Sequence, residues 1–264
     1  MLKIIKKEIN EFRMFLNALP VTVTALLITA VFSMNLLANK SIALPLPWMA
    51  LDAGIIISWL LFLVMDTVTK HFGPKCATGL SVFATVISLF FSLIFALASL
   101  IPGVWGEANS TSVVENNLIN SVLDRTFGGT WYVVFGSAVA FIVAALVNNF
   151  SNFGIGRCFR KNPDGAVAFF FRAYLSTALG QFVDNITFSL IVSRTFFGWT
   201  FTQCVVCALT GMVAETVLEL VFWRLGYKIC QRWKSEGVGR EYFMFLNKKC
   251  ETEACESGEV GAEK

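Results

Sequence analysis

The residues best suited to chemistry lie in one apolar stretch, which runs from Phe169 to Ser193. The stretch is long enough to cross a bilayer, which takes about 20 residues, and yet it contains the carboxylate of Asp184 and the amide of Gln181. A carboxylate near the centre of a membrane helix costs about 2.5–3.5 kcal/mol on insertion scales. A helix that keeps such a group must use it, either to bind a polar solute or to hydrogen-bond neighbouring helices.

The polar residues of this stretch share one side of a helix at about 100° per residue. The residues on that side are Thr177, Gly180, Gln181, Asp184 and Phe188, and the neighbouring Asn185 is a further candidate for substrate binding. Lipid cannot satisfy polar groups, so this side should face other helices or a water-filled cavity. We predict that it binds a polar solute. The alternative is that it only joins neighbouring helices.

A second pair of polar side chains precedes this stretch. The segment 147–151 (VNNFS) resembles 183–187 (VDNIT), so that Asn148 and Asn149 stand where the later segment has an aspartate and an asparagine. Transporters are often built from repeated units that hold the substrate where the units meet. We therefore predict that Asn148 and Asn149 contribute to the same site.

Three further charged residues lie at the edges of apolar segments. Asp66 and Lys70 are one helical turn apart, which suits either an ion pair beside the membrane or an inner gate or coupling site. Arg172 lies near the start of the central stretch. It could extend to the membrane interface or pair with a buried carboxylate.

Two glutamates are one turn apart in the last apolar segment, Glu215 and Glu219. Carboxylates this close disfavour each other's charge, so one of them could carry a proton for coupling. Arg224 could instead neutralise Glu219, which would be a structural role. Glu215 stays a candidate for coupling or gating.

The elements that must position these residues are membrane helices. The 264 residues are 56% hydrophobic and only 15% charged, whereas soluble domains have about 45–50% apolar and about 25% charged residues. Only helices suit long apolar runs without an alternating pattern. We predict an all-α, polytopic membrane protein with six transmembrane helices. The six apolar runs are 19–37, 48–69, 77–101, 131–153, 169–193 and 202–227.

Basic residues are distributed unevenly between the predicted loops. They gather before the first run and after the second, fourth and sixth runs. By the positive-inside rule, we predict that both ends of the chain lie on the cytoplasmic side of the cell membrane. Residues 1–18 then form a cytoplasmic amphipathic segment, with no cleavable signal peptide expected. Residues 19–229 form the transmembrane domain, with an external loop at 102–130, and 230–264 form a cytoplasmic tail whose acidic end is disordered.

The composition argues against several classes of function. Of the seven cysteines, Cys204 and Cys207 form a CxxC within an apolar run, and His71 is the one histidine, so we expect free thiols and no metal site. A Ser-His-Asp set and a phosphate-binding loop are both missing from the sequence. The net charge of +3 comes from loop residues and does not indicate nucleic-acid binding. We expect no enzymatic activity and no cofactor.

Two motifs resemble the signatures of the queuosine precursor transporter family, also called the vitamin uptake transporter family. The first is Asp66 to Gly73 (DTVTKHFG). The second combines Ser176-Thr177 with Gln181, Asp184 and Phe188. The resemblance covers about 36–227, and it implies a six-helix plan similar to the substrate-binding subunits of energy-coupling-factor vitamin transporters.

The resemblance also implies a substrate, namely a 7-deazaguanine base such as preQ0, preQ1 or queuine that is imported for queuosine salvage in tRNA. The chemistry of the residues suits such a base. Asp184 can accept its N–H donors, Gln181, Asn148 and Asn149 can both donate and accept, and aromatic rings can stack on it. The resemblance therefore implies that the protein carries a small molecule across a lipid bilayer.

The chain departs from the family pattern at three positions. Ala145 and Asn148 stand where many members have glutamine and aspartate, and Glu215 stands near a basic residue of many members. The ligand could therefore be another base, a nucleoside or another flat heterocycle. One alternative function is a substrate-binding subunit driven by a separate ATPase module, and another is a non-transporting scaffold or sensor. The energy source and a homo-oligomeric state stay open.

Overall fold

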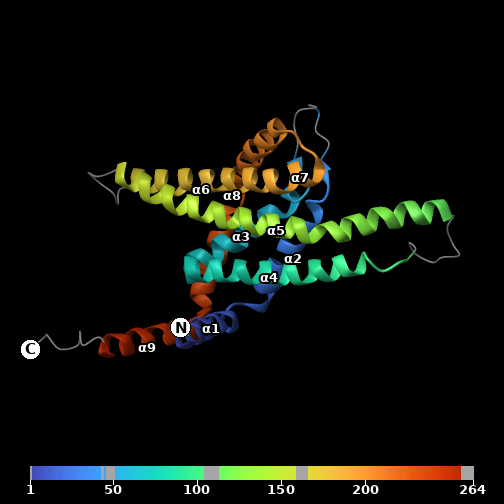
Figure 1. The fold of residues 1–264 in the computed structure, drawn as a ribbon. Coiled ribbons are helices and arrows are strands. Elements are labelled where there is room, and N and C mark those ends of the chain that lie inside the picture. Colours follow the sequence, from blue (N-terminus) through green and yellow to red (C-terminus); the bar gives the residue numbers. More distant parts are fainter. Residues whose placement is uncertain (1, 43–44, 46–50, 104–112, 159–165, 257–264) are drawn as a thin grey trace, which may run out of the picture.

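The computed structural model describes residues 2–42, 45, 51–103, 113–158 and 166–256, and this part of the chain is almost entirely helical (Figure 1). Its elements are α1 (Leu2–Ala18), α2 (Val21–Leu37), β1 (Ser41–Ile42), β2 (Leu51–Asp52), α3 (Ile55–Phe72), α4 (Pro74–Ala98), α5 (Val113–Cys158), α6 (Ala166–Phe188), the π-helical segment η1 (Ser189–Ser193), α7 (Arg194–Phe197), α8 (Phe201–Glu236) and α9 (Arg240–Glu256).

Each of the six predicted apolar runs falls on a helix, namely α2, α3, α4, α5, α6 and α8. Within the described residues, four segments are long and apolar enough to cross a membrane: Ile55–Phe72, Pro74–Ala98, Asn117–Val147 and Phe201–Phe222. Helix α2 gives a fifth when it is joined to Lys6–Ala18, from which it bends by 106°. The chain is thus a multi-pass membrane protein with four to five such spans, while the count of six stays a prediction.

The second predicted run begins differently from our expectation. We predict a helix from residue 48, but Leu51–Asp52 forms β2, which pairs antiparallel with β1, and α3 begins only at Ile55. The Asp52 carboxylate accepts a hydrogen bond from the Gly54 N–H at 2.8 Å. An aspartate that bonds nearby backbone in this way competes with helix formation, which explains the later start.

The predicted external loop is shorter in the structure. Helix α5 begins at Val113, so the part of 102–130 from that residue onward is helical, and residues 104–112 lie outside the described part. Likewise, α9 extends to Glu256, whereas 257–264, the rest of the acidic end, lies outside the described residues.

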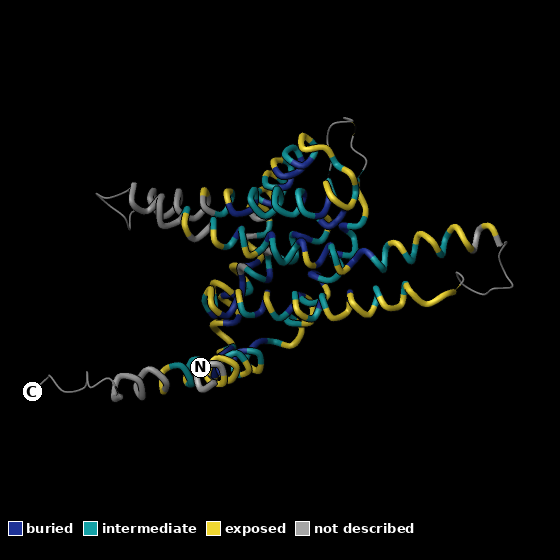
Figure 2. The backbone as a smooth tube through the Cα atoms, viewed as in Figure 1, coloured by how far each residue is buried: buried dark blue, intermediate teal, exposed yellow. Residues whose placement is uncertain are grey.

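Helix α4 shows how the helices divide their surface between protein and lipid (Figure 2). One side carries small or medium residues that are buried, namely Ala77, Leu80, Ser81, Ala84, Ser88 and Ser92. The other side exposes large apolar residues, namely Val82, Val86, Phe90, Phe91, Leu93, Ile94 and Leu97. Small residues let membrane helices approach closely, and the exposed apolar stripe is what a lipid-facing helix requires.

Helix α6 ends in the π-helical turn η1, which packs against α5. The hydroxyl of Tyr132 donates to the Ile191 carbonyl at 2.9 Å, a backbone oxygen within the widened turn. A Cβ at Gly136 would meet the Val192 side chain, so glycine is needed for this close approach. These contacts hold the end of α6 against α5, and both α6 and η1 also pack against α8.

Helices α1 and α9 pack together against the turn between α3 and α4. Phe15, Phe72, Trp233 and Tyr242 are buried in one hydrophobic cluster there. The Phe72 ring lies edge-on to Phe15 at 5.2 Å and stacks on Phe243 at 5.7 Å. We call this arrangement the α1–α9 clasp.

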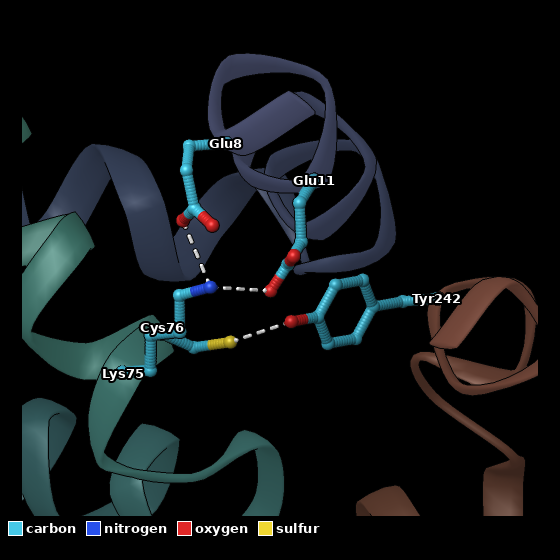
Figure 3. A network of polar contacts seen from close by, with 5 residues as sticks. All are labelled: Glu8, Glu11, Lys75, Cys76 and Tyr242. Atoms are coloured by element: carbon cyan, nitrogen blue, oxygen red, sulfur yellow. Dashed lines mark hydrogen bonds and ion pairs between the residues drawn. The ribbon is translucent and has the colours of Figure 1, made fainter. Parts of the chain in front are cut away.

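Polar contacts complete the clasp (Figure 3). Lys75 Nζ lies 2.8 Å from Glu8 Oε2 and 2.9 Å from Glu11 Oε1. Cys76 Sγ lies 3.1 Å from the Tyr242 hydroxyl, and burial raises the pKa of that tyrosine. Glu11 is buried, so its pairing matters more to stability than that of the half-exposed Glu8, because exposed ion pairs contribute only about 0–1 kcal/mol.

The clasp predicts a difference between two glycines of the α8–α9 turn. Gly237 and Gly239 both have positive φ, 67° and 83°, so alanine at either costs about 1–2 kcal/mol of backbone strain. A Cβ at Gly239 would in addition meet the Phe72 ring, whereas nothing lies within 4 Å of one at Gly237. We expect Gly239→Ala to unfold at a lower temperature than Gly237→Ala and to release α9 faster in limited proteolysis. Equal protease sensitivity of the two variants would contradict this packing.

Candidate functional site

Three predicted site residues, Gln181, Asn185 and Glu215, come together where α6 packs against α8. Asn185 Nδ2 donates to Glu215 Oε2 at 3.0 Å and to the Gln181 backbone carbonyl at 2.9 Å. The Thr216 hydroxyl donates to Gln181 Oε1 at 3.0 Å. Thr216 was not singled out from the sequence, although its place directly after Glu215 could have suggested it. These four side chains link the two helices.

The interior of this arrangement is buried and incompletely paired. Gln181 and Glu215 are each only 8% exposed. Within the described residues, the Gln181 Nε2 atom is buried and has no hydrogen-bond partner. A buried donor left in this state costs about 1–3 kcal/mol. It is therefore positioned to donate to an acceptor that is not part of the described chain.

A glycine of α8 makes room for the Asn185 amide. Gly211 lies one turn before Glu215, and a Cβ there would come within 3.0 Å of Asn185 Cγ. Residues four apart share one face of a helix. The sequence therefore places Gly211 and Glu215 side by side, with the amide held against the first and bonded to the second.

Two further carboxyl groups act electrostatically on this region, those of Asp184 and Asp52. Asp184 interacts with Asp52, and both interact with Glu215. Asp52 belongs to β2, whose backbone also lies against the Cys207 thiol of α8. Burial raises the pKa of Asp52, although the hydrogen bond from Gly54 opposes this effect. We name Asp52, Gln181, Asp184, Asn185, Glu215 and Thr216 the polar cluster.

Asp52 falls within the predicted apolar run 48–69, but the sequence did not identify it as a site residue. The reason is that Asp52 reaches the cluster through the β1–β2 hairpin, which is a tertiary arrangement. Strands of two residues are too short to show an alternating pattern in the sequence.

The remaining predicted residues of this helix side lie around the cluster. Thr177 is half-buried, one turn before Gln181. Phe188 is partly buried and packs against the apolar group of Ala38, Val133 and Val192. Its ring thus contacts protein on at least one side, which limits the surface it could offer to a ligand.

Four predicted residues cannot be placed by their side chains. The backbones of Asp66, Asn148, Asn149 and Arg172 belong to α3, α5 and α6, but their side chains lie outside the described part of the structure. Helix α5 packs along α6, so the two asparagines lie on a helix that neighbours the cluster. Their role in the site stays a prediction.

Helices α3 and α8 remain in close contact beyond the cluster, in the direction of α9. Trp59 stacks on Phe222 with ring centroids 4.6 Å apart and an angle of 23°. Further along, a Cβ at Gly226 would lie 3.3 Å from Leu63 Cδ1 and 3.4 Å from Thr67 Oγ1. Sequence reasoning missed this aromatic pair, since aromatic residues are common in apolar runs.

The structure does not bring Lys70 to the polar cluster. Lys70 is exposed near the end of α3, one turn beyond Thr67. Thr67 lies at the level of Gly226, which is roughly 16 Å from Glu215 along α8 at about 1.5 Å per residue. Any coupling role of Lys70 would therefore have to act at a distance from these carboxyl groups.

The arrangement does not resemble a metal centre. Among the described residues, no three His, Cys, Asp or Glu side chains are grouped closely enough to hold an ion. Cys204 and Cys207 are buried and free, as predicted, and Cys204 Sγ donates to the Ser189 carbonyl at 3.4 Å. The chemistry that the cluster offers is hydrogen bonding and charge.

Comparison with known proteins assigns this membrane protein to a family. No curated protein and no solved structure matches the chain. Residues 52–229 match the family model described as "Putative vitamin uptake transporter", and this match includes the whole polar cluster. The match confirms the family expected from the two motifs, and it is a family of transporters rather than of enzymes. The chain therefore belongs to the vitamin uptake transporter family.

Proposed function

We propose that this protein imports a 7-deazaguanine base, used for queuosine in tRNA, across the cell membrane and binds it at the polar cluster. The observation that carries the proposal is the buried pair of Gln181 and Glu215 between α6 and α8, near Asp184, in which the Gln181 Nε2 atom has no partner among the described residues. Gln181 and Asp184 also belong to the second signature motif. A transporter of this family needs a polar site within its apolar body, and the described residues offer this one.

The hydrogen-bonding edge of a deazaguanine ring fits these groups. Its ring N–H and exocyclic amino group are donors, and a carboxylate such as Asp184 can accept both. Its carbonyl oxygen is an acceptor, and the Gln181 Nε2 atom is a buried donor without a partner in the described chain. A site that hydrogen-bonds a polar edge in this way rejects compounds that lack it, because its own groups would then be left unpaired.

We further propose that the protein works as a secondary transporter with both ends in the cytoplasm. The distribution of basic residues supports this orientation. The runner-up is a substrate-binding subunit that needs an ATPase module supplied by other proteins.

Asp184→Ala is expected to abolish uptake, because the ring N–H donors would lose their acceptor. The assay expresses the full chain in a bacterium that can neither make nor import deazaguanines, supplies one precursor at a time, and measures queuosine in tRNA. Membrane expression of the variant is the control. Normal queuosine levels in a well-expressed Asp184→Ala strain would disprove the site assignment.

Gly211→Ala is expected to weaken uptake by about threefold to tenfold, because a displaced Asn185 amide loses about one hydrogen bond, worth about 0.5–1.5 kcal/mol. The matched control is Gly226→Ala, which also adds a methyl group to a tight contact on α8 but meets Leu63 and Thr67 instead. Uptake kinetics at low precursor concentration would compare the two. A control that loses as much uptake as Gly211→Ala would show that the effect is general packing.

Uptake is expected to persist when this chain alone is supplied to a host without energy-coupling-factor modules. A secondary transporter needs only an ion gradient, whereas a binding subunit needs its ATPase. The measurement is the rate of precursor accumulation before and after the membrane potential and proton gradient are dissipated. Accumulation that appears only after ATPase modules are added would favour the binding-subunit function.

A further inference from the structure

The polar cluster gathers three carboxyl groups without a positively charged partner among the described residues. The groups that act electrostatically on Glu215 are the carboxyl groups of Asp184 and Asp52 and the amide of Asn185. Carboxylates inside a membrane protein normally pair with a cation, or they give up their charge. The opposite charge must therefore come from elsewhere in the chain, from a proton or from the ligand.

The basic residues on the same elements lie too far along the helices to serve. Arg172 precedes Asp184 by roughly 18 Å along α6, and Arg194 follows it by roughly 15 Å, at about 1.5 Å per residue. Arg224 follows Glu215 by roughly 13 Å along α8. These separations leave a proton or the ligand as the source of a positive charge at the level of Glu215.

The geometry of Glu215 leaves part of its carboxylate for such a ligand. Asn185 uses both hydrogens of its amide, one for the Gln181 carbonyl and one for Glu215 Oε2. Within the described part of the chain, the second oxygen of Glu215 accepts no hydrogen bond, so it can accept one from a ligand. A carboxylate that an amide holds in one orientation can bind a compact cation such as an ammonium group without losing further side-chain freedom.

An independent observation points to a ligand rather than to a proton alone. The Gln181 Nε2 atom is buried and, in the described residues, lacks an acceptor. A proton on Glu215 or Asp184 would not supply one. A ligand with a carbonyl oxygen for Gln181 and an ammonium group for Glu215 would satisfy both needs.

We propose that this site selects heterocycles that carry a protonated amine over neutral heterocycles of the same ring, and that Glu215 binds the ammonium group. This inference rests on the proposed function, since it assumes that the ligand is a deazaguanine held by Asp184 and Gln181. Asp52 adds negative charge to the same region from β2. The preference for a cationic ligand then arises because the carboxyl groups lie in an apolar surrounding, where their attraction to an ammonium group is stronger than in water.

Two ligands with one ring test this inference. The probes are 7-aminomethyl-7-deazaguanine, which is cationic at neutral pH, and 7-cyano-7-deazaguanine, which is neutral. Their affinities for the purified full-length protein in detergent would be measured by calorimetry. We expect the cationic probe to bind at least about tenfold more tightly.

Variants identify the residue responsible. Glu215→Gln is expected to reduce the preference to below about threefold, because it lowers the affinity for the cationic probe more than the affinity for the neutral probe. Glu236→Gln is the matched control, since Glu236 lies on the same helix but pairs with Arg232 at the surface. It should keep the full preference. Asp52→Asn, on β2, provides a second test if Glu215→Gln does not fold, and it should also reduce the preference.

The outcomes separate this inference from the proposed function. Binding of the neutral probe as tightly as the cationic one by the wild-type protein would overturn the charge selection and leave deazaguanine transport standing. A preference that survives in both Glu215→Gln and Asp52→Asn would also overturn it. Binding of neither probe would overturn the proposed function, and this inference with it.

Discussion

The hydrogen bond from Asn185 to Glu215 is the interaction that the arrangement of α6 against α8 depends on. It is the point at which a carboxyl group of α8 is accommodated within an apolar body, and it requires α6 to lie at one height and one rotation. Gly211 allows the approach, Thr216 fixes Gln181, and the β1–β2 hairpin brings Asp52 to the same region. Without a driving force between apolar surfaces in lipid, such polar contacts and close packing define how membrane helices assemble.

The parts of the structure that follow from local pattern could be predicted from the sequence. Long apolar runs must be helical in a bilayer because every backbone group needs an internal partner, and each of the six runs falls for most of its length on a helix. The helical spacing of Gln181, Asp184 and Asn185 correctly placed them near one another on α6. Glu215 was recognised because a carboxylate in an apolar run is costly wherever it lies.

The parts that depend on tertiary contacts could not be predicted. Asp52 lies in the cluster because a strand of two residues folds back before α3, and Trp59 meets Phe222 because Gly226 lets two helices approach. The contact of Asn185 with Glu215 joins residues 30 positions apart in the chain, and no spacing rule connects positions on separate helices. The clasp could likewise not be predicted, since the sequence of α9 is mainly polar.

The α1–α9 clasp has a consequence for the order in which this protein assembles. Phe15 lies in α1, and its ring contacts Phe72 of α3 and Tyr242 of α9. Helix α9 is synthesised after the other two. During synthesis, the cluster around Phe72 must therefore wait, with an open side, until α9 has been made. The cluster around Phe72 is therefore completed late in synthesis, after the membrane helices between α1 and α9 have been made.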